Sequence, residues 1–319
     1  MGFGRRQVLT GGVALGGMMA ARLLPAVTPP RVDVRERGWF QRLQLTYRTV
    51  EIGLKNPFSV LHVSDTHLTA AYPDETQWLE FAEERTRVFG GLQEHSLAEA
   101  LAWAKTSVDC VIHTGDLIDF QSKANLDLVK RYFGSVDGLL CTAGNHEFHC
   151  LPKEAGVKPT EAYNETCRAA LDGAFGRDLR FAARMVNGVI FVAMENVYGF
   201  FSEYQVRRFR EEAAKGLPMV LCLHVPIYTD GIRRTWGRFL SMGKRFADAA
   251  LPLPEGDIQR QLDDSLTRDF VTYLRKEPLL KAVLAGHLHL FAEDRFSPTA
   301  MEYVVGANYF PNGQEVMFV

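Results

Sequence analysis

The amino-acid sequence predicts an α/β fold whose core sheet is largely parallel. Five short apolar runs rich in Val, Ile and Leu have the composition of strands that are buried on both faces. Helical patterns follow most of these runs, and such alternation of strands and helices is typical of α/β folds. Each run also ends in side chains that can bind a metal ion, and ligands of α/β sheets bind beyond the carboxyl ends of the strands.

The elements are assigned in chain order from these patterns. The five buried strands are expected at the apolar runs that begin at Phe58, Cys110, Leu139, Met219 and Ala282. Further strands are expected at residues 44–54, 188–193 and 301–305. The periodicity of apolar residues predicts helices at residues 75–88, 96–105, 124–133, 161–171 and 202–214. No internal repeat interrupts the pattern, so residues 27–319 are predicted to form one domain.

Residues 1–26 differ in composition from the rest of the chain. Arg5 and Arg6 precede a Gly- and Ala-rich apolar stretch, which is typical of an export signal of the twin-arginine type. The stretch is short for a membrane span, and Arg22 interrupts it. We therefore expect an exported protein, periplasmic or at the cell surface. An uncleaved anchor is the alternative, and contact with a membrane is expected only in that case.

The composition limits the classes of protein to consider. The chain has 319 residues, 47% of them hydrophobic, which is enough to bury a full core. The formal net charge is -2, and no long run of one sign occurs. A protein that mainly binds nucleic acid usually carries a basic excess, so no stable nucleic-acid partner is expected.

The five cysteines show no C-x-x-C spacing of a thiolate metal site. Cys110, Cys141 and Cys222 lie inside apolar strand runs and are predicted to be inert core residues. Cys150 and Cys167 lie in a predicted loop and a predicted helix, and they could pair in an oxidising compartment. The sequence alone leaves that connectivity open.

The residues at the strand ends predict a metal site. Asp65 and His67 are two residues apart, so on an extended backbone both side chains would point to one face and could hold one metal. Asp116 follows Gly115, which permits a tight turn, and its two carboxylate oxygens could bridge two metals. The other candidate ligands offer an amide oxygen or an imidazole nitrogen: Asn145, His224, His287 and His289. Mixed nitrogen and oxygen ligands without thiolate suit Mn, Fe or Zn.

These endings resemble the motifs of the calcineurin-like metallophosphoesterase superfamily. They match, in order, D-x-H, G-D-x-x-D, G-N-H-E, a lone His after a strand, and G-H-x-H, across residues 58–289. The resemblance implies a four-layered α/β/β/α sandwich, in which two sheets are flanked by helices. It also implies a hydrolase of phosphomonoesters or phosphodiesters with two divalent metal ions, in which a metal-bridged hydroxide attacks phosphorus.

The resemblance further implies a role for each motif residue. The first metal would be held by Asp65, His67 and His289, and the second by Asn145, His224 and His287. Asp116 would bridge both metals. His146 would donate a proton to the leaving group, and Asp119 would orient His146. Ser/Thr protein phosphatases carry Arg-Gly after the second motif, whereas Phe120 and Gln121 stand there in this chain, which argues against that activity.

The remaining residues near the motifs receive no such role. Glu147 is interpreted as a supporting or structural residue without a metal. The histidines outside the motifs are expected in the core or at the surface: His62, His95, His113 and His149.

Two other functions remain possible from the sequence, and one segment is unexplained. The alternatives are a nuclease of the same superfamily, which the balanced charge disfavours, and a metal-stabilised binding protein without turnover. Residues 227–285 are far longer than a typical loop, so they must contain structure of their own. The first part of this segment is basic and aromatic, and it is either a cap that contacts substrate through Arg233 and Arg234 or a solvated helical insertion.

Overall fold

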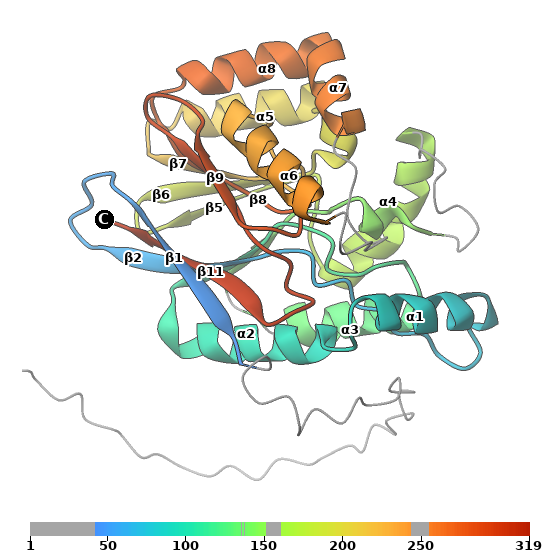
Figure 1. Cartoon of the computed structure of the whole chain (residues 1–319). Coiled ribbons are helices and arrows are strands. Elements are labelled where there is room, and N and C mark those ends of the chain that lie inside the picture. Colours follow the sequence, from blue (N-terminus) through green and yellow to red (C-terminus); the bar gives the residue numbers. More distant parts are fainter. Residues whose placement is uncertain (1–41, 135, 137, 151–160, 244–254) are drawn as a thin grey trace, which may run out of the picture.

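Two β-sheets pack face to face, and helices cover both outer faces (Figure 1). The computed structural model describes residues 42–134, 136, 138–150, 161–243 and 255–319. In Figure 1, α2 (Gln93–Ser107) and α3 (Lys123–Phe133) cover one outer face, and α5 (Glu203–Ala213) and α8 (Ser265–Lys276) cover the other. The predicted four-layered sandwich is confirmed.

The first sheet contains the three parallel strands that follow one another in the N-terminal half. Its order is β1 (Gln44–Val50), β11 (Asn312–Phe318), β2 (Phe58–Val63), β3 (Cys110–His113) and β4 (Leu139–Cys141). β11 runs antiparallel to β2, and β1 runs parallel to β11. The strand predicted at residues 44–54 ends at Val50, because its partner strand β11 ends at Phe318, which pairs with Val50.

The second sheet contains four parallel strands between two antiparallel edge strands. Its order is β5 (Phe181–Val186), β6 (Val189–Met194), β7 (Met219–Cys222), β8 (Leu280–Ala285), β10 (Met301–Val304) and β9 (Ala292–Arg295). β5, β9 and β11 were not predicted from the sequence. β5 is an exposed edge whose centre carries Arg184, and β9 consists mostly of charged residues, so neither shows the apolar run of a buried strand.

The predicted helices are present. Besides α2, α3 and α5, they are α1 (Thr76–Val88) and α4 (Glu161–Phe175), which extends four residues beyond its predicted end at residue 171. Residues 227–285 contain structure of their own, as expected: α6 (Asp230–Gly243), α7 (Glu255–Asp263), α8 and β8. Two single turns of 3₁₀ helix also matter below, η3 (His146–Phe148) and η5 (Val197–Gly199). The export segment predicted at residues 1–26 lies outside the described residues.

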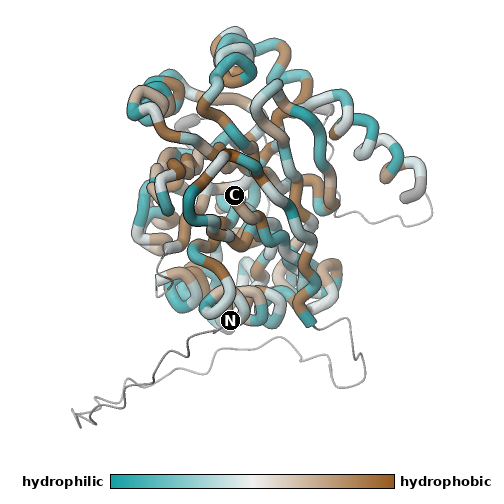
Figure 2. Tube along the Cα trace, turned by 90° about the vertical axis from the view of Figure 1, so that its left-hand side faces the viewer, coloured by the Kyte–Doolittle hydropathy of each residue, from teal (hydrophilic) through white to brown (hydrophobic). Residues whose placement is uncertain are grey.

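Apolar side chains fill the three spaces between the four layers. Between the sheets, the ring of Phe58 lies 5.1 Å from that of Phe318 and 6.1 Å from that of Phe191, measured between centroids. Burial of one such side chain stabilises the fold by roughly 1.5–3 kcal/mol. Figure 2 shows the outer helices alternating hydrophilic and hydrophobic residues along the tube, as expected for helices with one face on a sheet.

The cysteines of the strands are buried as predicted, and the structure also resolves the pairing that the sequence left open. Cys110, Cys141 and Cys222 are buried free thiols in β3, β4 and β7, and burial raises the pKa of Cys110 to about 11. Cys150 and Cys167 form a disulfide that ties the end of η3 to α4. None of the described helices has the length and apolar character needed to cross a membrane.

Candidate metal centre

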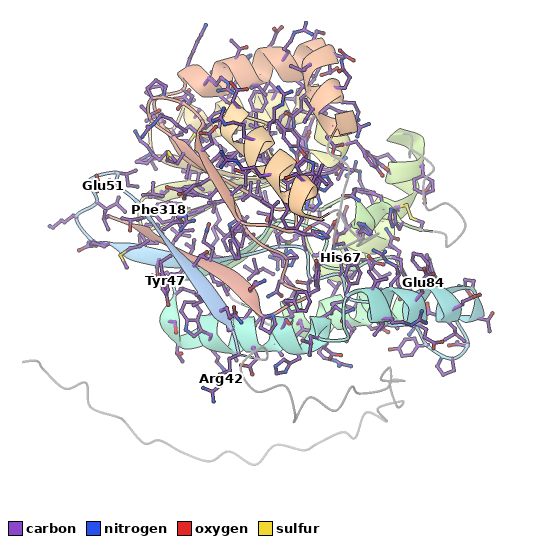
Figure 3. The ribbon with its side chains drawn as sticks, in the orientation of Figure 1. Arg42, Tyr47, Glu51, His67, Glu84 and Phe318 are labelled. Carbon is purple, nitrogen blue, oxygen red and sulfur yellow. A yellow bond between two sulfur atoms is a disulfide. The ribbon has the colours of Figure 1, made fainter. Side chains whose placement is uncertain are left out.

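The carboxyl ends of β2, β3, β4, β7 and β8 meet at one edge of the sandwich, which His67 marks in Figure 3. The first sheet contributes the carboxylates, one histidine and one amide. The second sheet contributes only imidazoles. The residues that these strands deliver are Asp65, His67, Asp116, Asn145, His224, His287 and His289. The structure thus brings together all seven residues that the sequence assigned to metal binding.

Four of these residues form a first cluster. Nε2 of His289 lies 3.2 Å from Oδ1 of Asp65 and 3.1 Å from Nε2 of His67. Oδ2 of Asp116 lies 3.6 Å from Nε2 of His67. One ligand atom from each residue lies within 4.8 Å of the others, which is close enough for one cation to contact them all.

A second cluster shares Asp116 with the first. Nε2 of His224 lies 3.3 Å from Oδ2 of Asp116 and 3.2 Å from Oδ1 of Asn145. Nδ1 of His287 lies 3.2 Å from Nε2 of His224. Asp116 therefore stands between the two clusters, where its carboxylate can contact a cation on each side.

The backbone at these positions corrects the sequence interpretation of Asp65 and His67. Neither lies on an extended strand: β2 ends at Val63, and φ is 56° at Asp65 and 50° at His67. Their amides donate to the carbonyls of Gly115 and Asp116, both at 2.9 Å, so the loop after β3 pulls the chain out of the strand conformation. The two side chains still converge, with Nε2 of His67 4.0 Å from Oδ1 of Asp65.

Two glycines make this close approach of loops possible. Gly115 has φ of 95°, and a Cβ there would lie 2.8 Å from Nδ1 of His224. A Cβ at Gly286 would overlap Ser64 and lie 2.6 Å from Oδ2 of Asp65. Any larger residue at either position would therefore displace a candidate ligand.

The chemistry of the clusters fits bound cations. Two imidazole nitrogens that face each other at 3.1 Å, as in His67 and His289, need a proton or a cation between them. Burial lowers the pKa of His224, but the charge and hydrogen bond of Asp116, together with the charge of Asp65, outweigh burial and raise that pKa to about 10. The buried carboxylates therefore need positive charge close to them, and divalent cations would supply that charge.

Asp119 organises the residues around the candidate proton donor. Its Oδ1 lies 2.9 Å from Nδ1 of His146 and 2.9 Å from Nδ1 of His67. Hydrogen bonding to Asp119 places the proton of His67 on Nδ1 and leaves Nε2 free to face the first cluster. The guanidinium of Arg85 completes the arrangement, with Nε 2.6 Å from Oδ2 and Nη2 3.0 Å from Oδ1 of Asp119.

The charges near His146 favour its protonated form. Burial lowers the pKa of His146, but the carboxylates of Asp116 and Asp119 act more strongly and raise it to about 9. The pKa of His67 is lowered to about 4, because burial and the neighbouring His146 outweigh the hydrogen bond to Asp119. The two imidazoles that contact Asp119 therefore differ in protonation. His146 is suited to hold a proton, and neutral His67 is suited to offer the lone pair of Nε2 to a metal.

Glu147 supports the loops and does not face either cluster. Its carboxylate accepts from the amides of Asp116, Leu117, Ile118 and Gly144, at distances from 2.6 to 3.2 Å. Burial, followed by the charge of Asp116, raises the pKa of Glu147 to about 7. Its role is to hold the turns after β3 and β4 together.

The histidines outside the motifs lie in the core or at the surface, as expected, and one of them, His149, also lies beside the site. His62 and His113 are buried, and each has a ring nitrogen 3.0 Å from a threonine hydroxyl. Burial lowers the pKa of each to about 3. His95 is exposed. His149 is partly buried and lies beside the site, with its ring centroid 4.3 Å from that of His146.

Three residues of the site were missed in the sequence. Arg85 carried a signal, because it lies on the helix stripe formed by Trp78, Ala82 and Phe89, where a charge needs a buried partner. Asn196 accepts from the amides of His224 and Val225, at 3.2 and 3.0 Å. Asp257 lies 3.0 Å from His287. Neither Asn196 nor Asp257 stands in a pattern that sequence reasoning could have detected.

With this geometry in place, comparison with known proteins decides the family. The family model of calcineurin-like phosphoesterases matches residues 58–291, which is more than half of the chain. The chain belongs to the calcineurin-like phosphoesterases. This membership confirms the resemblance seen in the motifs, and with it the expected class of activity, hydrolysis of phosphoesters.

Three solved structures of low sequence identity are similar to the chain. A dimetal phosphatase from Danio rerio is 15% identical with a TM-score of 0.46, and the match covers 80% of this chain and 89% of that one. A phosphopantetheinyl hydrolase from Mycobacterium tuberculosis is 15% identical with a TM-score of 0.41, covering 78% and 90%. A 5'-nucleotidase from Candida albicans is 12% identical with a TM-score of 0.40, covering 84% and 48%. No curated protein sequence shows significant similarity to the chain.

Proposed function

We propose that this calcineurin-like phosphoesterase hydrolyses phosphoesters with two divalent metal ions, Mn, Fe or Zn. The observation that carries the proposal is the sharing of Asp116 between two ligand clusters. The first ion would be held by Asp65, His67, Asp116 and His289. The second would be held by Asp116, Asn145, His224 and His287. A mixed set of imidazole, carboxylate and amide donors suits these metals and differs from the thiolate donors of a structural zinc site.

The residues of the chain would divide the work as follows. Two divalent ions supply positive charge to the phosphoryl oxygens and lower the pKa of the attacking water. His146 holds the proton that the leaving oxygen needs. A positioned imidazole donor of this kind is worth about a hundred- to ten-thousandfold in rate. Asp119 fixes the orientation of His146 and the tautomer of His67, and Arg85 holds Asp119 in place.

The test combines metal analysis with a substrate panel. Purified protein is stripped of metal, reloaded with Mn, Fe or Zn, and assayed on bis- and mono-p-nitrophenyl phosphate, nucleotides, phospholipid headgroups and DNA. We expect two metal ions per chain and turnover of at least one ester class. Two bound ions without turnover on any ester would favour the metal-stabilised binding protein instead. Cleavage of DNA that weakens steeply with salt would favour the nuclease.

We further propose that α6 contributes to substrate selection. Its apolar side, with Ile232 and Trp236, is buried against Leu288 of the G-H-x-H loop, whereas Arg233 and Arg234 are exposed. This packing places the helix next to a ligand-bearing loop. Exposed cations there are suited to a substrate group beyond the scissile phosphate. The alternative is a helix whose arginines are merely solvated.

Replacement of both arginines separates these alternatives. The variant Arg233→Ala/Arg234→Ala should raise KM for the preferred panel substrate and leave the kinetics on a small synthetic ester unchanged. The matched control is Arg207→Ala/Arg208→Ala on α5, which should change neither. Unchanged kinetics of the α6 variant on both substrates would leave α6 as structure only.

The export proposal rests on the N-terminal sequence and is supported by one structural feature. The disulfide between Cys150 and Cys167 is typical of an oxidising compartment outside the cytosol. We propose that Arg5 and Arg6 direct the protein through the twin-arginine route. A reporter fused to residues 1–41 should be exported, and Arg5→Lys/Arg6→Lys should retain it in the cytosol. Equal export of both reporters would contradict a role of Arg5 and Arg6 in export.

A further inference from the structure

Helix α7 delivers a carboxylate to one of the candidate ligands from outside the motifs. Oδ2 of Asp257 lies 3.0 Å from Nε2 of His287. The other ring nitrogen of His287, Nδ1, faces the second cluster and lies 3.2 Å from Nε2 of His224. Both side chains of the pair are over nine-tenths buried. Nε2 of His287 therefore donates to Asp257, and Nδ1 is the nitrogen left for a metal.

Several contacts clamp α7 in the place where Asp257 can reach His287. Arg260 forms an ion pair with Asp257 and donates to the carbonyl oxygen of Tyr198 in η5. The side chain of Gln261 donates to the carbonyl of Pro226 at 2.8 Å and accepts from the amide of Tyr228 at 3.2 Å. These contacts attach α7 to the segments that follow β6 and β7.

The turn in η5 is shaped to admit α7. Gly199 has φ of 88°, and a Cβ there would lie 2.8 Å from the carbonyl oxygen of Asp257. Asn196, which precedes the same turn, accepts from the amide of His224. One small structural unit thus supports both imidazoles of the second cluster, His224 through the backbone and His287 through its ring.

We propose that Asp257 is a positioning residue for the second metal, and that α7 acts as the support of that site. The proposal rests on the proposed dinuclear function. A carboxylate that accepts the free N–H of a metal-binding imidazole fixes the tautomer and ring orientation and makes the other nitrogen a stronger donor. Loss of such a partner typically weakens metal binding by about 10- to 100-fold.

The segment at residues 227–285 would thereby have a function other than covering the substrate. Asp257 lies 30 residues before His287 in the chain and outside the sequence motifs. Its effect should be confined to the second cluster, since Asp65, His67 and His289 have other partners. A merely structural role of α7 would instead weaken both sites together.

The test measures metal binding directly. Asp257→Asn keeps the side-chain volume and an acceptor oxygen, and it removes the charge. Titration of the metal-free protein with Mn or Zn, followed by calorimetry and elemental analysis, should show two sites in the wild type. In Asp257→Asn one of the two sites should weaken by about 10- to 100-fold and the other should be retained. Asp257→Glu should restore part of the lost affinity because it restores the charge.

Controls distinguish this proposal from its alternatives. Asp263→Asn makes the same change at an exposed position of α7 and should leave both sites intact. Metal-free Asp257→Asn should still unfold cooperatively, with a melting temperature lowered only by the loss of the ion pair between Asp257 and Arg260. Two unchanged sites in Asp257→Asn, or equal weakening of both, would overturn the inference. A wild type that binds no metal would instead overturn the proposed function.

Discussion

At the scale of single residues, the proposed ligands stand out by their backbone. Five of them have positive φ: Asp65, His67, Asp116, His287 and His289. A left-handed conformation costs a residue other than glycine about 1–2 kcal/mol. Summed over the five residues, this cost is comparable with the whole stability of a typical domain. The left-handed conformations therefore persist only because hydrogen bonds and packing offset the cost. One such bond runs from the amide of His287 to Oδ2 of Asp65 at 2.9 Å.

Removal of the shared charge should weaken both metal sites at once. Asp116→Asn retains an oxygen that can accept from the amide of His146, as Oδ1 does now at 2.9 Å, so the loop should keep its shape. The variant loses the charge that two cations share. We expect elemental analysis to show a loss of both metals and activity to fall with them. Two retained metals with full turnover would contradict the bridging assignment.

Removal of the proton donor should act on turnover and not on metal content. His146→Gln should bind both metals and lose most activity on esters with poor leaving groups, by about a hundredfold or more. Esters with good leaving groups should lose less, because their leaving oxygen needs little protonation. The control is His149→Gln, whose ring lies 4.3 Å away and has no role in the proposed mechanism. An equal loss on both ester classes would point to a binding role for His146.

At the scale of elements, the sequence predicts what is buried and periodic. The five central strands were predictable because each is a continuous apolar run, and their ends carried the ligands. The edge strand β9 was not, because its sequence from Ala292 to Arg295 is mostly charged and it forms a strand by pairing with β10. The contact of Asp257 with His287 was equally invisible, since it depends on how α7 docks on η5. Sequence periodicity contains no information about such docking.

The disulfide links the element that carries His146 to a helix on the outer layer. It closes a loop with a sequence separation of 17, for which loop-closure entropy predicts a stabilisation of about 3 kcal/mol. Reductant should therefore lower the melting temperature of the wild type. Cys150→Ser/Cys167→Ser should melt at the reduced temperature with or without reductant. We also expect the release of Cys150 to lower kcat on esters with poor leaving groups, because Cys150 follows His146 by only four residues.

If reductant does not change the melting temperature of the wild type, the disulfide between Cys150 and Cys167 does not form in solution. The control is Cys222→Ser, which changes a buried free thiol of β7. Its response to reductant should equal that of the wild type. This control separates the effect of the crosslink from any general sensitivity of the thiols.

At the scale of the whole molecule, the site joins the two sheets. One sheet supplies Asp65, His67, Asp116 and Asn145, and the other supplies His224, His287 and His289. Each ion would therefore be bound by residues of both sheets and would link them. Elsewhere the two sheets are joined by apolar contacts such as those among Phe58, Phe191 and Phe318. Metal that binds only the folded state should stabilise the entire fold, by about 2.7 kcal/mol at a free concentration of a hundred times Kd.

Glu302 should make the stability of the whole fold depend on pH. It lies in β10, fully buried, and accepts from the amide of Ile227 at 2.8 Å. Burial raises its pKa to about 8, from an ordinary value of 4.5. Between these two pH values the folded protein keeps a proton that the unfolded chain has released. Stability is therefore lost as the pH rises through this window, by up to about 1.4 kcal/mol per pH unit from this group.

The variant Glu302→Gln tests this dependence, because glutamine imitates the neutral acid and cannot ionise. Denaturant unfolding of both proteins is measured from pH 4.5 to pH 9 in the absence of metal. Other titrating groups act alike in both, so the difference between the two free energies of unfolding isolates Glu302. The variant should gain stability relative to the wild type as the pH rises. Glu99→Gln, at an exposed position of α2, should give a constant difference. Parallel curves for Glu302→Gln and the wild type would show that this carboxyl titrates normally.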